Sequence, residues 1–136
     1  MFDTVLVAGL GLMGGSMAKT IKARTLSRVL GWNRTRATAE QALADGSIDA
    51  IATDALFREV DLVIIGLYPQ ATVDWLLENM PKMKKGCVIV DMVGVKQFMV
   101  DHLEQAALDA GVHYVGGHPM AGREFSGLDY ALPTLF

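Results

Sequence analysis

The chain has 136 residues, 51% of them apolar, with a mean hydropathy of +0.32 and a formal net charge of −3 at pH 7. This length suits one domain with a proper core, and so apolar a composition excludes a disordered segment. The acidic balance lacks the dense basic surface that neutralises phosphates, so we expect no nucleic-acid partner.

Cys87 is the single cysteine of the sequence, which excludes an intramolecular disulfide. It begins an apolar run and is expected to be a buried thiol of a strand. The N-terminus has no signal-peptide pattern, and no apolar run approaches the length of about 18 residues that a membrane span needs. We therefore expect a cytoplasmic protein without a membrane partner.

Short apolar runs alternate with helical patterns along the chain, which predicts parallel strands joined by crossover helices. The expected fold is α/β, with a doubly wound, mostly parallel sheet between two helical layers and residues 1–136 as one domain. The first half predicts a strand at 4–8, a helix at 12–23, a strand at 28–32, a helix at 35–45 and a weak strand at 48–52. The second half predicts a strand at 62–67, a helix at 69–80, a strand at 87–92, a helix at 97–110 and a strand at 112–115.

Apolar residues at helical spacing indicate which side of each predicted helix faces the sheet. Trp32 and Trp75 are interpreted as packing residues rather than as platforms for a stacked ligand. The inward positions are expected to be Met17, Ala18, Ile21, Ala39, Ala42, Leu43, Val73, Leu76, Leu77, Met80, Met99, Leu103, Ala106 and Ala110.

A Gly-x-Gly-x-x-Gly motif follows the first predicted strand and opens the first helix, the context in which such a loop binds a dinucleotide. Gly9 is expected to allow a tight turn, Gly11 to let a pyrophosphate approach the backbone, and Gly14 to let the helix pack close to the strand. The N–H groups of the helix N-terminus would then bind the phosphates. The alternative is a tight turn without a ligand. The predicted cofactor contacts in this loop are Gly9, Leu10, Gly11, Leu12, Met13 and Gly14.

The end of the second strand indicates which cofactor is preferred. NAD sites usually place an acidic residue there to bind the ribose hydroxyls, whereas this chain has Asn33, Arg34 and Thr35. Asn33 would not repel a 2′-phosphate, Arg34 could pair with it and stack on adenine, and Thr35 could cap the next helix. We predict NADP, with NAD as the less favoured cofactor. The alternative is that Arg34 and Arg36 are solvated residues of the first helical turn.

Ligands of an open parallel sheet lie beyond the carboxyl ends of its strands. The segments that follow the later strands contain His118, the candidate for acid–base chemistry, whereas His102 and His113 are interpreted as structural or solvated. The sequence has no metal-ligand spacing and no nucleophile elbow, so no metal and no acyl transfer are expected. Further cofactor contacts are predicted from Leu67, Tyr68, Pro69, Val93 and Gly94.

Four segments carry a resemblance: Gly-Leu-Gly-Leu-Met-Gly-Gly-Ser at 9–16, Asp-Leu-Val-Ile-Ile-Gly-Leu-Tyr-Pro at 61–69, residues 91–96, and Gly-His-Pro-Met-Ala-Gly-Arg-Glu at 117–124 followed by Ser-Gly. They are similar to the prephenate/arogenate dehydrogenase family over the whole chain, and the last segment is the most specific. The resemblance implies a Rossmann domain of an enzyme of tyrosine biosynthesis. Hydride would leave ring C4 of prephenate for the nicotinamide as the ring carboxylate departs as CO2, giving 4-hydroxyphenylpyruvate.

The same resemblance assigns the catalytic residues. His118 would bond the C4 hydroxyl of the substrate and assist its deprotonation, and Glu124 would help to shape the substrate pocket. Two positions depart from the family: many relatives have serine in place of Gly94, and Asn33 with Arg34 replaces the acidic residue of NAD-specific members.

The family continues into a helical domain that dimerises and binds the carboxylates of the substrate. We expect that domain to be absent from residues 1–136 and a homodimer to form in the full-length protein. Arogenate is the alternative substrate. The sequence also leaves open a 3-hydroxyacid dehydrogenase-like or imine-reductase-like cofactor domain, which shares Asn-Arg-Thr after the second strand, and an NADP-binding module without catalysis.

Overall fold

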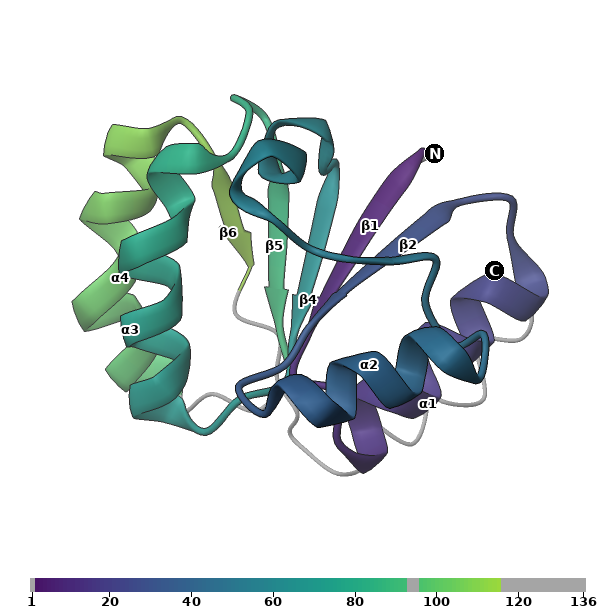
Figure 1. Ribbon diagram of the computed structural model, residues 1–136. Coiled ribbons are helices and arrows are strands. Elements are labelled where there is room, and N and C mark those ends of the chain that lie inside the picture. Colours follow the sequence, from purple (N-terminus) through teal and green to yellow (C-terminus); the bar gives the residue numbers. More distant parts are fainter. Residues whose placement is uncertain (1, 93–95, 116–136) are drawn as a thin grey trace.

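The first strand, β1 (Thr4–Ala8), lies inside a six-stranded sheet with the order β3-β2-β1-β4-β5-β6 (Figure 1). The computed structural model describes residues 2–92 and 96–115, and every neighbouring pair of strands within them is parallel. The strand order reverses at β1, as in doubly wound sheets. The other strands are β2 (Arg28–Trp32), β3 (Ala50–Ile51), β4 (Leu62–Ile65), β5 (Val88–Asp91) and β6 (His113–Val115).

Helices cover both faces of the sheet (Figure 1). α1 (Leu12–Arg24) and α2 (Arg36–Ala44) lie on one face, and α3 (Pro69–Asn79) and α4 (Lys96–Ala110) lie on the other. Two 3₁₀ helices, η1 (Asp54–Glu59) and η2 (Met80–Lys82), complete the described elements. The predicted three-layer α/β fold is confirmed.

The central strands are buried on both faces, which explains their continuous apolar runs. Along β1, Val5 and Val7 pack into the core beneath α1 and α2, whereas Leu6 and Ala8 pack into the core beneath α3 and α4. β4 alternates in the same way. Each helical layer therefore has its own hydrophobic core, and the sheet separates the two.

Most of the predicted inward positions of the helices are buried, but Leu43 and Leu77 are 42% and 46% exposed. Each directly follows a buried residue, Ala42 or Leu76. Consecutive helical residues differ by about 100° around the axis, so the side chain after a central inward position turns away from the sheet. The side chain of Met99 lies outside the described part of the chain.

Several element boundaries differ from the prediction. β3 contains two residues, although Ile48 just before it is buried as expected. β4 ends at Ile65, and Gly66 still donates its N–H to the carbonyl oxygen of Ala8 at 2.9 Å before the chain turns toward α3. The sequence did not predict η1, because six residues with one buried side chain, Phe57, show no helical period.

The two tryptophans and the cysteine are packing residues, as predicted. Trp75 is buried, with its ring centroid 5.7 Å from that of Trp32 and 5.8 Å from that of Phe57. Cys87 is fully buried, and this burial raises the pKa of its thiol to about 12. The thiol is therefore protonated at neutral pH and unreactive.

Two aspartates accept hydrogen bonds from backbone N–H groups at the amino edge of the sheet. Asp61 accepts from the N–H groups of Asp3 and Thr4 at 2.9 Å each and pairs with Lys84. Asp49 similarly accepts from Val29 at 2.8 Å and pairs with a lysine of α1. Burial alone would raise the pKa of either carboxyl, but the lysine and backbone hydrogen bonds outweigh it and lower both pKa values.

Asp61→Asn is expected to lower the free energy of unfolding at neutral pH by about 1–2 kcal/mol, because a charged acceptor of two N–H groups becomes neutral. The folded-state pKa is lowered, so this stabilisation is complete above the unfolded-state pKa of about 3.9. It is lost as the pH falls through the folded-state pKa. Urea unfolding as a function of pH should therefore show a shallower loss of stability in acid for the variant.

Asp54→Asn is the matched control for this measurement. Asp54 pairs with Lys82, its side chain is 78% exposed, and within the described residues it accepts no backbone N–H. The control should change stability by less than about 0.5 kcal/mol. Equal losses in the two variants would contradict the importance of the backbone hydrogen bonds.

Candidate functional site

The loop between β1 and α1 requires glycine at its first position. Gly9 has a φ of +93°, in the left-handed region that other residues rarely adopt. A Cβ on Gly9 would lie 2.9 Å from the carbonyl oxygen of Gly66, just beyond β4. The N–H of Gly9 donates to the carbonyl oxygen of Trp32 at 2.8 Å. The predicted tight turn is confirmed, and the ends of β2 and β4 hold it from either side.

Gly14 and Gly11 differ in the space that is available for a side chain. A Cβ on Gly14 would lie 1.7 Å from the carbonyl oxygen of Gly9, so glycine allows α1 to begin close to the loop, as predicted. A Cβ on Gly11 would have no atom of the described residues within 4 Å. The space in front of Gly11 is open, as the approach of a phosphate to the backbone requires.

The N-terminus of α1 adjoins this open space. Gly11 is the N-cap residue, and within the described residues no side chain caps the helix and its first turn contains no acidic residue. First-turn N–H groups have no partner inside a helix and lie at the positive end of its dipole. The site therefore fits an anionic phosphate, which would accept hydrogen bonds from these donors.

Asn33 makes a contact that the sequence did not predict. Its Oδ1 accepts a hydrogen bond from the N–H of Leu10 at 2.8 Å, and its Nδ2 donates to the carbonyl oxygen of Thr35 at 3.1 Å. The side chain thus joins the residue after β2 to the glycine loop across 23 positions of the sequence. No local pattern signals such a bond, because it depends on the pairing of β1 with β2.

The residues after Asn33 lie at the start of α2. Arg34 is exposed and forms no ion pair within the described residues, whereas Arg36 pairs with Glu40 at 3.4 Å. Thr35 is the N-cap residue, as predicted, but its hydroxyl makes no capping hydrogen bond. Arg34 is therefore the cation that remains available to a ligand at the end of β2.

The end of β4 lies beside the glycine loop. A Cβ on Gly9 would lie 3.1 Å from Cδ2 of Leu67, so these two segments are in contact. Tyr68 is the N-cap residue of α3 and is 83% exposed, and Pro69 is the first residue of the helix, as predicted. Two of the predicted cofactor-binding segments therefore meet at the carboxyl edge of the sheet.

A buried carboxylate lies at the carboxyl end of β5. Asp91 is 1% exposed, and its Oδ2 accepts a hydrogen bond from the hydroxyl of Tyr114 at 3.0 Å. Burial, together with the nearby charge of Asp91, raises the pKa of Tyr114. This bond joins the last residue of β5 to β6, a contact that the sequence did not predict.

Four of the predicted site residues, Val93, Gly94, His118 and Glu124, lie outside the described residues. His102 and His113, interpreted as structural or solvated, are exposed. Within residues 2–92 and 96–115, no group of three His, Cys, Asp or Glu residues could hold a metal ion. No helix in this part of the chain is long and apolar enough to cross a membrane.

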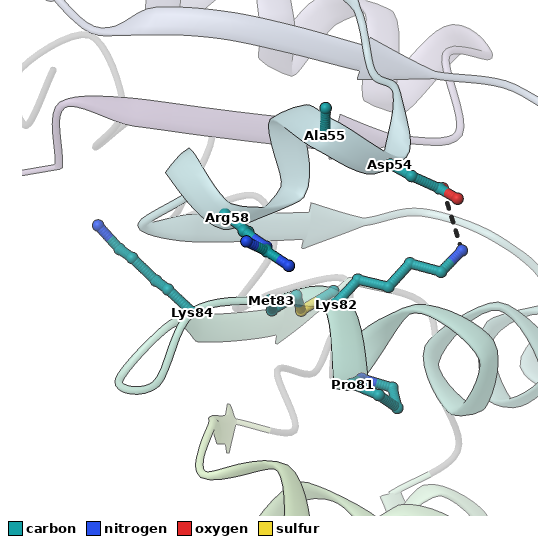
Figure 2. A pocket seen from close by; sticks show the side chains of 7 residues that line it. All are labelled: Asp54, Ala55, Arg58, Pro81, Lys82, Met83 and Lys84. Atoms are coloured by element: carbon teal, nitrogen blue, oxygen red, sulfur yellow. Dashed lines mark hydrogen bonds and ion pairs between the residues drawn. The ribbon is translucent and has the colours of Figure 1, made fainter.

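The described surface includes a hollow beside the glycine loop and another on the amino side of the sheet. One, of about 420 Å³, begins at Gly11 and runs between Lys19 of α1 and Gln41 of α2. The other, of about 740 Å³, lies between η1 and the segment before β5, on the amino side of the sheet (Figure 2). Its Lys82 is bonded to Asp54, as Figure 2 shows, and its Lys84 is paired with Asp61. Only the first hollow is continuous with the glycine loop.

The strand order and the glycine loop between β1 and α1 define a domain of the Rossmann class. A family model described as "Prephenate dehydrogenase, nucleotide-binding domain" matches residues 17–136. The chain belongs to this family.

The sequence is also similar to that of a known enzyme. The chain is 37% identical over 140 residues to the prephenate dehydrogenase of Bacillus subtilis (strain 168), a match that covers 100% of the chain and 38% of that relative. The chain thus spans well under half the length of this relative.

Two solved structures share the fold. The prephenate dehydrogenase from A. aeolicus in complex with hydroxyphenyl propionate and NAD+ has a TM-score of 0.64 and 23% identity, over 90% of this chain and 43% of that chain. An imine reductase from Myxococcus stipitatus in complex with NADP+ has a TM-score of 0.67 and 25% identity, over 82% of this chain and 39% of that chain. The structural neighbours therefore include complexes with both nicotinamide cofactors.

The glycines provide a paired test of the loop geometry. Gly14→Ala is expected to lower the free energy of unfolding by at least about 2 kcal/mol, because its Cβ would overlap a backbone oxygen that cannot move freely. Gly11→Ala, with open space around its Cβ, should change it by less than about 0.5 kcal/mol. Denaturant unfolding of both variants measures the difference, and similar losses would contradict this loop geometry.

Proposed function

We propose that this chain is the NADP-binding domain of a prephenate dehydrogenase. The observation that carries the proposal is a glycine loop held beside Asn33 and Arg34, in a chain of this family. Residues 33–36 are Asn-Arg-Thr-Arg, so no acidic side chain occupies the position that usually binds the ribose hydroxyls of NAD. A 2′-phosphate would therefore meet no repulsion from this segment.

Arg34 is the residue expected to bind the 2′-phosphate. Its side chain is exposed and forms no ion pair in the described part of the chain, so binding would break no existing pair. A guanidinium pairs with phosphate through two parallel hydrogen bonds and can also stack on adenine. Arg36 is a weaker candidate, because it already pairs with Glu40.

The remaining parts of the cofactor would lie along the carboxyl edge of the sheet. The open space at Gly11 and the N–H groups of α1 suit the pyrophosphate. The loop residues Gly9, Leu10, Leu12, Met13 and Gly14 would surround it. The nicotinamide side would be lined by Leu67, Tyr68, Pro69, Val93 and Gly94.

A bound nicotinamide supplies the hydride acceptor for oxidative decarboxylation. By family resemblance, His118 would hydrogen-bond the C4 hydroxyl of prephenate and take its proton as the C4–H bond breaks. Glu124 would shape the pocket around the ring. Loss of the ring carboxylate as CO2 leaves its electron pair to complete the aromatic ring, and return of the proton from His118 to the C4 oxygen gives 4-hydroxyphenylpyruvate.

The substrate and assembly of the whole protein follow from the same family. The stretch from His118 to Glu124 favours prephenate or arogenate over a 3-hydroxy acid or an imine, despite the fold shared with an imine reductase. We propose a cytoplasmic homodimer for the full-length protein. Activity on a 3-hydroxy acid, with none on prephenate or arogenate, would overturn this assignment.

Calorimetric titration with NADP, NAD and ADP-ribose 2′-phosphate tests the cofactor. We expect micromolar NADP binding, weaker NAD binding, and a loss of about 10- to 100-fold in NADP affinity for Arg34→Ala, the range of a charge-assisted hydrogen bond. NAD affinity should be unchanged by this substitution, because NAD has no 2′-phosphate.

Two controls accompany this titration. Arg36→Ala should change NADP affinity little, and Gly11→Ala should weaken NADP and NAD together, because its methyl group would occupy the space of the pyrophosphate. NAD binding as tightly as NADP would disprove the cofactor preference. If neither cofactor binds, either the loop is a turn without a ligand or residues 1–136 need the helical domain to form the site.

The 136-residue chain by itself should turn over prephenate negligibly. Prephenate is a dianion, and beyond Glu124 the sequence has no Arg, Lys or His to neutralise its carboxylates. Absorbance at 340 nm, recorded with saturating NADP and prephenate, measures the rate of reduction. Robust turnover by the isolated chain would show that residues 1–136 bind the substrate unaided.

A further inference from the structure

We infer that Asn33 is a positioning residue for the pyrophosphate that NADP and NAD share, acting through the N–H of Leu10, whereas its neighbour Arg34 acts on the 2′-phosphate. The inference rests on the proposed binding of a nicotinamide dinucleotide. It assigns Asn33 a function beyond the lack of charge that favours NADP.

Both polar atoms of the Asn33 carboxamide form hydrogen bonds. Oδ1 accepts from the N–H of Leu10 at 2.8 Å, and Nδ2 donates to the carbonyl oxygen of Thr35 at 3.1 Å. The reversed amide would place a donor against the N–H and an acceptor against the carbonyl, so these two bonds define its orientation. The half-buried side chain is therefore a fixed link between the start of α2 and the glycine loop.

Asn33 holds the loop together with a backbone hydrogen bond and a buried side chain. The N–H of Gly9 bonds to the carbonyl oxygen of Trp32, and Asn33 holds the next N–H along the chain. The side chain of Leu10 is 6% exposed and belongs to the core beneath α1 and α2. With its side chain in the core and its N–H bound to Asn33, Leu10 determines the direction in which the chain enters Gly11 and the first turn of α1.

A preorganised loop matters for affinity because the phosphate donors are backbone N–H groups whose directions follow the chain. If the loop is not held, binding must first order it, and that cost reduces the observed affinity. The cost is the same for NADP and NAD, since both carry the pyrophosphate. Loss of the Asn33 link should therefore leave the ratio of the two affinities unchanged.

Aspartate at position 33 would separate the effect of the bond to Leu10 from the effect of charge beside the 2′-phosphate. A carboxylate can still accept from the N–H of Leu10, but it cannot donate to the carbonyl oxygen of Thr35. Its negative charge would also lie one residue from Arg34, where the 2′-phosphate is proposed to bind. Asn33→Asp should keep most of the NAD affinity and lose NADP affinity, whereas Asn33→Ala should lower both.

The experiment measures NADP and NAD affinity for the wild-type chain, Asn33→Ala, Asn33→Asp and Arg34→Ala. Asn33→Ala should weaken both cofactors by the same factor, about five- to tenfold for the loss of one half-buried hydrogen bond. Arg34→Ala should weaken NADP alone. Selective loss of NADP in Asn33→Ala, or no change in either affinity, would overturn the inference.

Amide hydrogen exchange of the cofactor-free chain gives a readout that does not depend on binding. The N–H of Leu10 should exchange at least fivefold faster in Asn33→Ala than in the wild type, and at the wild-type rate in Arg34→Ala. An unchanged rate in Asn33→Ala would show that Asn33 does not hold the loop. If the wild type shows protected Leu10 but binds neither cofactor, the proposed function fails while the structural link stands.

Discussion

The close contact between Gly14 and the carbonyl oxygen of Gly9 is the constraint on which the rest of the site depends. A Cβ at Gly14 would lie 1.7 Å from that oxygen, so α1 can begin at this distance from β1 only with glycine there. The short connection leaves the N-terminus of α1 at the carboxyl edge of the central strand. The shortness of this loop also keeps Leu10 close to the helix, and its side chain is buried in the core.

The two edges of the sheet are used differently. At the amino edge, the backbone N–H groups of Thr4 and Val29 are bonded by Asp61 and Asp49, and lysines balance both carboxylates. The carboxyl edge has a helix start without a capping side chain and an exposed Arg34. Among the described residues, the carboxyl edge therefore keeps N–H donors at a helix start and an exposed cation available to an anionic ligand, whereas the aspartates of the amino edge are already paired.

The sequence predicted what depends on local pattern. Apolar runs such as that of β1 identify buried parallel strands, and a glycine motif between a strand and a helix identifies the tight glycine loop. Leu43 and Leu77 show where this reasoning fails, because composition does not tell how wide the buried stripe of a helix is. η1 was missed for a related reason: a single buried Phe57 has no periodicity to detect.

Interactions between distant segments could not be predicted, because they depend on strand order and register. Asn33 reaches Leu10 only because β2 lies beside β1 with Trp32 opposite Ala8. The same pairing places Arg34 beyond the end of β2 and outside the loop. Two adjacent residues after one strand therefore differ in their surroundings: Asn33 bonds to the glycine loop, and Arg34 is exposed. Sequence alone attributes both residues to cofactor choice, because it does not show that Asn33 is bonded to the glycine loop.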